Sequence, residues 1–75
     1  MIKISLLNYC SQKKLVALAK KSGFIIGSGK KHVVVRNKEG EFITTIPRHN
    51  TIKKPTTKGI IQALIKAGAE IEITK

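Results

Sequence analysis

The chain has 75 residues, 41% of them hydrophobic, which suffices for a single domain (residues 1–75) with one core and leaves no room for a separate cofactor domain. It carries 15 Lys and Arg against 4 Asp and Glu, and the net charge of 15 − 4 = +11 favours a nucleic acid or an acidic protein as its partner. No stretch approaches the ~20 apolar residues that span a bilayer, and a single cysteine cannot form an intrachain disulfide. We therefore expect a cytoplasmic protein without a membrane partner.

The charges are unevenly distributed along the chain. Residues 1–38 hold nine Lys and Arg and no acid, and residues 42–69 hold five more, again without an acid. The acids are confined to a predicted turn at residues 39–41 and to residues 70–72 near the C-terminus. Aromatic residues make up only 4% of the chain, which argues against single-strand binding by rows of stacked rings.

The first predicted helix covers residues 12–22. Ser11 is a suitable N-cap, and Gly23 stands where a helix commonly ends in a left-handed residue. Lysines gather on one side of the helical wheel, and the opposite side carries Leu15, Leu18, Ala19 and Ser22. Residues 24–26 follow as a short apolar strand.

Two further strands and a hairpin are predicted next. Gly27-Ser28-Gly29 begins a turn, and the β-branched run His32–Asn37 reads as a strand. Asn37–Gly40 has the composition of a hairpin loop. Glu41–Ile46 is the third strand, which Pro47 closes because proline cannot continue the hydrogen-bond ladder.

The remaining chain predicts a basic loop, a second helix and an edge strand. The loop covers residues 48–54, and the helix begins at Pro55 and is stopped by Gly68. Its expected buried face consists of Ile60, Ile61, Leu64 and Ile65. Residues 70–74 alternate like an edge strand, for which residues 2–6 are a possible partner. The predicted fold is α+β: a three-stranded antiparallel sheet with two helices on one face, and extra terminal edge strands.

The second strand predicts a surface that can act on RNA. Period-two alternation places His32 and Arg36 on the face opposite Val33 and Val35, which the helices would cover. RNA cleavage without a metal needs a base for the 2′-hydroxyl, an acid for the leaving 5′-oxygen, and cations around the phosphorane. An imidazole titrates near neutrality and can fill either proton-transfer role.

His32 is accordingly the candidate catalytic residue, with cations at Lys30, Lys31 and Arg36 to hold the phosphate. The second proton-transfer group stays open between His49, a lysine and the substrate. Two histidines without clustered Cys, Asp or Glu make a metal site unfavourable, and we expect no cofactor.

Further RNA contacts are expected along the chain. The glycine turn, Gly29 above all, allows backbone N–H groups to approach a phosphate closely. The basic loop and the start of the second helix supply Arg48, His49, Lys53, Lys54 and Lys58.

Three segments resemble the HicA family of toxin mRNA interferases. They are the helix with Ser-Gly-Phe at residues 15–24, the Gly-Ser…His strand start at residues 27–32, and Ile46-Pro47-Arg48-His49-Asn50 followed by residues 53–68. The resemblance covers roughly residues 12 to 69. In many relatives the histidine directly follows Gly-Ser, whereas this chain interposes residues 29–31.

This resemblance implies a fold like the double-stranded RNA-binding domain, with the order helix, three strands, helix. It also implies a ribonuclease that cleaves mRNA and that a HicB-like antitoxin protein holds inactive. The single catalytic histidine of the family corresponds to His32.

Two other functions fit the same composition. A non-catalytic module for double-stranded RNA would read helix shape through phosphates and 2′-hydroxyls with the same basic face. Alternatively, the charge serves mainly to dock an acidic protein. The first shifts RNA on a gel without shortening it, and the second predicts partner binding that survives His32→Ala.

Overall fold

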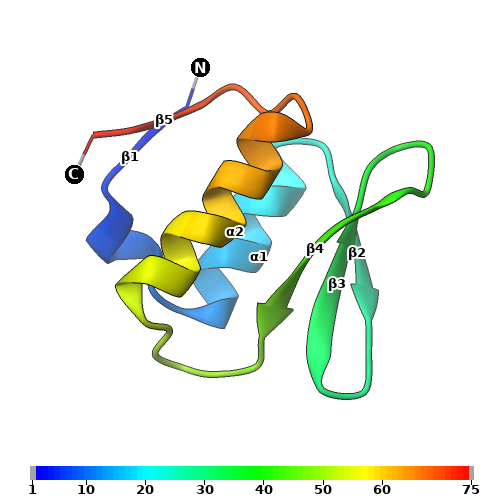
Figure 1. The fold of residues 1–75 in the computed structure, drawn as a ribbon, viewed down its shortest axis with the longest axis horizontal. Helices are drawn as coiled ribbons and strands as arrows, with labels where there is room; N and C mark the ends of the chain where they lie inside the picture. Colours follow the sequence, from blue (N-terminus) through cyan, green and yellow to red (C-terminus); the bar gives the residue numbers. More distant parts are fainter. Residues whose placement is uncertain (1, 75) are drawn as a thin grey trace.

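The computed structural model describes residues 2–74 and shows an α+β fold (Figure 1). In chain order its elements are β1 (Ile2–Ile4), the 3-10 helix η1 (Leu6–Tyr9), α1 (Gln12–Lys21), β2 (Ile25–Ser28), β3 (His32–Arg36), β4 (Phe42–Pro47), α2 (Lys54–Lys66) and β5 (Ile71–Ile73). The predicted order of helix, three strands and helix is confirmed. Helix η1 was not predicted, and none of the described helices is long and apolar enough to cross a membrane.

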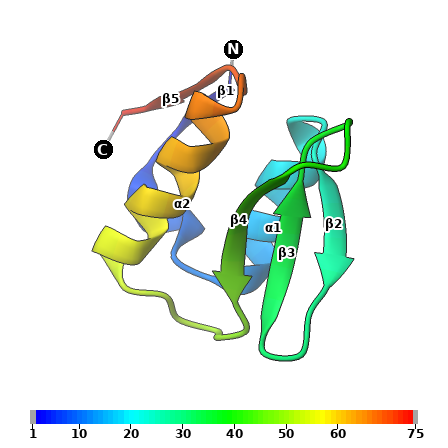
Figure 2. The same ribbon diagram turned by 45° about the vertical axis from the view of Figure 1, so that its right-hand side comes forward.

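The central sheet is antiparallel in the order β2-β3-β4, and both helices pack on the same face of it (Figure 2). Val33 and Val35 of β3 point into the core with Ile46 of β4, whereas His32 and Arg36 are exposed. The predicted alternation of β3 is therefore confirmed. The face of the sheet away from the helices carries no other element of the described chain.

Helix α1 begins and ends where local chemistry requires. The hydroxyl of Ser11 accepts a hydrogen bond from the backbone N–H of Lys14 at 3.3 Å, as an N-cap does. Leu15, Leu18 and Ala19 are buried against the sheet. Gly23 has a φ of +91°, a left-handed conformation that favours glycine after a helix.

Helix α2 starts one residue before Pro55, so the proline lies in the first turn, where its missing N–H costs nothing. Its buried stripe consists of Thr57, Ile60, Ile61 and Leu64. The prediction that Ile65 is buried is wrong, because this side chain is 37% exposed. It lies one helical step beyond the stripe and lines a groove with Ile71 and Ile73 of β5.

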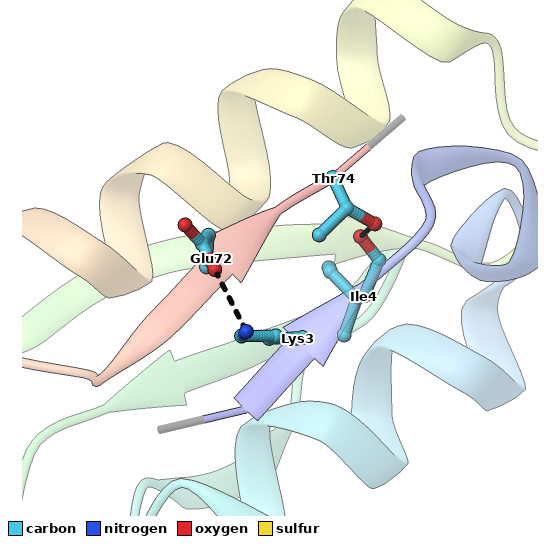
Figure 3. Close-up of polar contacts among 4 residues, drawn as sticks. All are labelled: Lys3, Ile4, Glu72 and Thr74. Carbon is cyan, nitrogen blue, oxygen red and sulfur yellow. Dashed lines mark hydrogen bonds and ion pairs between the residues drawn. The ribbon is translucent and has the colours of Figure 1, made fainter.

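The terminal strands, which the sequence offered as partners, do pair, and the pairing is parallel, with Ile2 opposite Ile71 and Ile4 opposite Ile73. This ribbon lies on the side of the helices away from the central sheet (Figures 1 and 2). Figure 3 shows Thr74 Oγ1 donating to the carbonyl oxygen of Ile4 at 2.9 Å, and Lys3 beside Glu72 at 4.0 Å. Because both partners of that ion pair are exposed, it contributes little to stability.

Two strands run further toward the C-terminus than predicted. Strand β2 continues through Gly27 and Ser28, which pair with Val34 and Val33, so the turn begins at residue 29 rather than 27. Pro47 is the last residue of β4 instead of lying beyond it. This is compatible with proline because β4 is an edge strand, whose outer N–H groups need no ladder partner.

Candidate functional site

His32 is the first residue of the central strand β3 and is exposed on the uncovered face of the sheet. Its neighbour across the ladder is Pro47 at the end of β4. An imidazole in this position is open to a large ligand, because the helices cover only the opposite face (Figure 2).

The turn before His32 is closed by the backbone of Gly29. The N–H of Gly29 donates to the carbonyl oxygen of His32 at 3.0 Å. A Cβ atom on Gly29 would stand 2.6 Å from that same oxygen, so only glycine fits without a backbone shift. Lys30 and Lys31 form the tip of the turn and are exposed. Residues 29–31, which stand between Gly-Ser and the histidine in this chain, therefore form a tight turn. The turn places two lysines directly before His32.

Arg48 reaches the same turn from the end of β4. Its Nη2 atom donates to Ser28 Oγ at 2.8 Å and to the carbonyl oxygen of Gly29 at 3.0 Å. The guanidinium therefore connects the segment after β4 to the last residue of β2, past the start of the central strand β3.

Arg36 lies at the other end of β3, four residues from His32. At ~3.3 Å per residue the two Cα atoms are about 13 Å apart. Arg36 Nη1 donates to the carbonyl oxygen of Gly40 at 3.2 Å, beside the β3–β4 hairpin. Arg36 therefore lies well apart from His32 along the same strand.

The loop after β4 is attached to the start of α1. The N–H of Gln12 donates to the carbonyl oxygen of His49 at 3.1 Å, and the N–H of Ile52 donates to the carbonyl oxygen of Cys10 at 2.9 Å. Ile52 is buried, while the side chain of His49 is exposed. His49 is thus held through its backbone, which leaves its imidazole free to meet solvent or a ligand.

Three exposed lysines gather at the start of α2: Lys53, Lys54 and Lys58. Lys53 occupies the N-cap position without a side-chain cap, and the first turn contains no acidic residue. The positive end of the helix dipole therefore adds to the lysine charges instead of being offset by a carboxylate.

The acidic residues lie away from His32. Glu39 and Glu41 belong to the β3–β4 hairpin at the opposite end of the sheet, and Glu72 belongs to β5. Within residues 2–74 no three His, Cys, Asp or Glu side chains are grouped so that they could hold a metal ion. The groups around His32 are cationic or backbone, a set that suits a phosphate.

Comparison with known families gives the decisive match. A family model described as the HicA toxin of bacterial toxin-antitoxin systems matches residues 13–69, more than half of the chain. The chain belongs to the HicA toxin family. It is therefore a toxin of a toxin–antitoxin system, with an antitoxin as partner. Searches of curated proteins and of solved structures gave no match.

For a HicA toxin, the structure gathers some of the predicted site residues and separates others. Gly29, Lys30, Lys31 and Arg48 surround the turn that leads to His32, while Arg36 stands apart. Sequence reasoning overlooked Ser28, which accepts the bond from Arg48. Its only sequence signal is its place in the Gly-Ser pair before the histidine, since the arginine that it meets is 20 positions away.

Proposed function

We propose that this toxin is a metal-independent endoribonuclease that cleaves mRNA, with His32 as its catalytic general acid or base. The observation that carries the proposal is the exposed His32 on the uncovered sheet face, directly after a turn with two lysines. Family membership supports the same function, because the resemblance of the chain to HicA interferases implies mRNA cleavage by a histidine at this position.

The reaction follows from the groups available. A base removes the proton of a ribose 2′-hydroxyl, and the resulting oxygen attacks the adjacent phosphorus. The bond from phosphorus to the 5′-oxygen then breaks, and an acid protonates that oxygen. The products are a 2′,3′-cyclic phosphate and a 5′-hydroxyl. His32 serves one proton transfer, and His49, a lysine or the substrate serves the other.

The cations have separate places along the RNA. Lys30 and Lys31, with the backbone around Gly29, contact the scissile phosphate and stabilise its developing negative charge. Arg36 contacts a neighbouring phosphate, as its distance from His32 requires. The flanking backbone meets the residues of the loop and of the α2 start: His49, Lys53, Lys54 and Lys58. Contacts of this kind tolerate sequence changes and weaken as salt rises.

The antitoxin in this proposal is a HicB-like protein that covers the site. Its surface would be acidic, since the toxin carries a net charge of +11. Titrating the antitoxin into the toxin should lower RNA cleavage until it stops at saturation. Undiminished cleavage by the saturated complex would exclude simple occlusion.

The test is incubation of the purified chain with a labelled RNA in EDTA, beside a His32→Ala variant whose fold is checked by circular dichroism. Wild-type protein should shorten the RNA in EDTA, and the variant should not. A variant that cleaves as fast as the wild type would remove His32 from the mechanism.

The alternative is a non-catalytic module for double-stranded RNA. The observation that favours it is the lysine cluster at the start of α2, which needs no histidine to bind phosphates. This alternative predicts that wild type and His32→Ala shift a duplex equally on a gel and leave its length unchanged.

A further inference from the structure

Arg48 makes the only side-chain hydrogen bonds to the β2–β3 turn found in the described part of the chain. One nitrogen, Nη2, serves both Ser28 Oγ at 2.8 Å and the carbonyl oxygen of Gly29 at 3.0 Å. The guanidinium is a charged donor, which makes stronger hydrogen bonds than a neutral one. They join segments 19 and 20 residues apart in the sequence.

The two backbone groups of Gly29 are both engaged. Its N–H is bonded to the carbonyl oxygen of His32, and its carbonyl oxygen is bonded to Arg48. The turn between them holds Lys30 and Lys31, adjacent cations that repel one another. Removing Arg48 therefore releases one side of Gly29 at a turn that carries two adjacent cations.

The guanidinium approaches from the side opposite the imidazole. Ser28 pairs with Val33, which is buried toward the helices, so its side chain belongs to the helix-facing side of the sheet. His32 and its partner Pro47 belong to the uncovered side. Arg48 therefore influences His32 through the backbone of the turn. The two side chains lie on opposite faces of the sheet and do not bind the same phosphate.

We propose that Arg48 is a positioning residue of the His32 site: by fastening Ser28 and Gly29, it fixes the backbone from which the imidazole projects. The catalytic part of this inference rests on the proposed ribonuclease function. It changes the role that the sequence suggests for Arg48, namely a cation that contacts the flanking RNA backbone.

The first test needs no RNA. Backbone amide exchange is followed by NMR in wild type, Arg48→Ala and Ser28→Ala. The Gly29 amide should exchange about tenfold faster in Arg48→Ala, because local opening of the turn costs less. The amides of Val33 and Val35 in the same sheet should keep their wild-type rates and so show that the variant is folded.

The second test separates positioning from direct RNA contact. Arg48→Ala should lower kcat about 10- to 100-fold, the scale expected when a catalytic group is displaced by about 1 Å, with KM within about twofold of wild type. Ser28→Ala should lower kcat about two- to tenfold, the equivalent of one hydrogen bond. The double variant should be no slower than Arg48→Ala, since both changes remove one linked contact.

Lys53→Ala is the matched comparison, because it removes an exposed cation from the RNA path without touching the turn. It should raise KM and reduce the salt dependence of binding while kcat stays unchanged. If Arg48→Ala behaves like Lys53→Ala and the Gly29 amide keeps its exchange rate, the positioning role is wrong and Arg48 is an RNA contact. An inactive wild-type protein with faster Gly29 exchange in Arg48→Ala would instead refute the ribonuclease function and leave the fastening intact.

Discussion

The two ends of the central sheet are both closed by turns, yet they are built in different ways. The β3–β4 hairpin is held by its own residues: Asn37 Oδ1 accepts from the N–H groups of Glu39 and Glu41 at 3.0 and 2.8 Å. Gly40 supplies a left-handed φ of +83°. The β2–β3 turn has one bond of its own, from the Gly29 N–H to the His32 carbonyl oxygen, and its side-chain bonds come from Arg48 beyond β4.

The charges of the two ends differ as well. At the hairpin, Glu39 and Glu41 stand beside Arg36 and Lys38, so that the local charges offset one another. At the His32 end, Lys30, Lys31 and Arg48 are cationic, and residues 29–31 of the turn include no acid. The hairpin end is neutral, and the His32 end is cationic. We therefore expect a polyanion to prefer the His32 end.

The largest expected difference between the ends concerns catalysis. His32→Ala should lower the single-turnover rate of RNA cleavage about 10²- to 10⁴-fold, the usual contribution of a general acid or base. Lys38→Ala, which removes a charge at the hairpin end, should leave the rate close to wild type. Equal losses in the two variants would mean that total charge, and not the position of His32, determines the activity.

A substitution at the turn should affect stability more than the same substitution elsewhere. Gly29→Ala places a methyl group 2.6 Å from the His32 carbonyl oxygen and should lower the free energy of unfolding by about 1–3 kcal/mol. Gly59→Ala is the matched control, since its Cβ meets nothing within 4 Å. In the interior of α2 it should raise the free energy by about 0.5–1 kcal/mol. Urea unfolding measures both, and a Gly29→Ala variant as stable as wild type would contradict the close approach.

The hairpin end can be weakened without harming the site. Asn37→Ala removes the acceptor of two backbone N–H groups and should lower the free energy of unfolding by about 1 kcal/mol. At a temperature well below the unfolding midpoint, RNA cleavage should proceed at the wild-type rate. A cleavage defect in this folded variant would show that the two ends are not independent.

The smallest expected effect is a difference between the cations of the two ends in how strongly they make RNA affinity depend on salt. Lys30→Gln should reduce the slope of log affinity against log salt by about 0.7, the value for one phosphate contact on a single strand. Lys38→Gln should leave the slope unchanged. The slopes are measured by fluorescence anisotropy with a labelled RNA on the His32→Ala background, where the strand stays intact, and equal slopes in both variants would remove the preference for one end.

The contrast also explains what the sequence could predict. The hairpin at Asn37–Gly40, the cap at Ser11 and the exposure of His32 depend on neighbouring residues and on period-two alternation, so local patterns sufficed. The extension of β2 through Ser28 could not be predicted in this way, because it depends on pairing with β3 and on the bond from Arg48.

The sequence predicted the positions of Arg36 and His32 relative to one another only in part. Alternation placed both residues on one face, but the four-residue spacing along an extended strand puts them about 13 Å apart. The hydrogen bond from Arg36 to the Gly40 carbonyl oxygen depends on the conformation of the hairpin, which alternation does not predict. Likewise, the exposure of Ile65 follows from how α2 is rotated against the sheet, which the pattern of apolar residues left undecided by one position.

The most direct measurement uses a substrate change instead of a protein change. A labelled RNA is first cleaved by wild-type protein in EDTA to locate the preferred bond, and the same RNA is then made with a single 2′-deoxyribose before that bond. We predict that cleavage at this bond stops, while the wild-type protein binds both strands alike, because the attacking 2′-oxygen is absent. Cleavage of the substituted strand at an unchanged rate would contradict the proposed reaction. In that reaction the 2′-oxygen attacks the phosphorus, and His32 either deprotonates the 2′-hydroxyl or protonates the leaving 5′-oxygen.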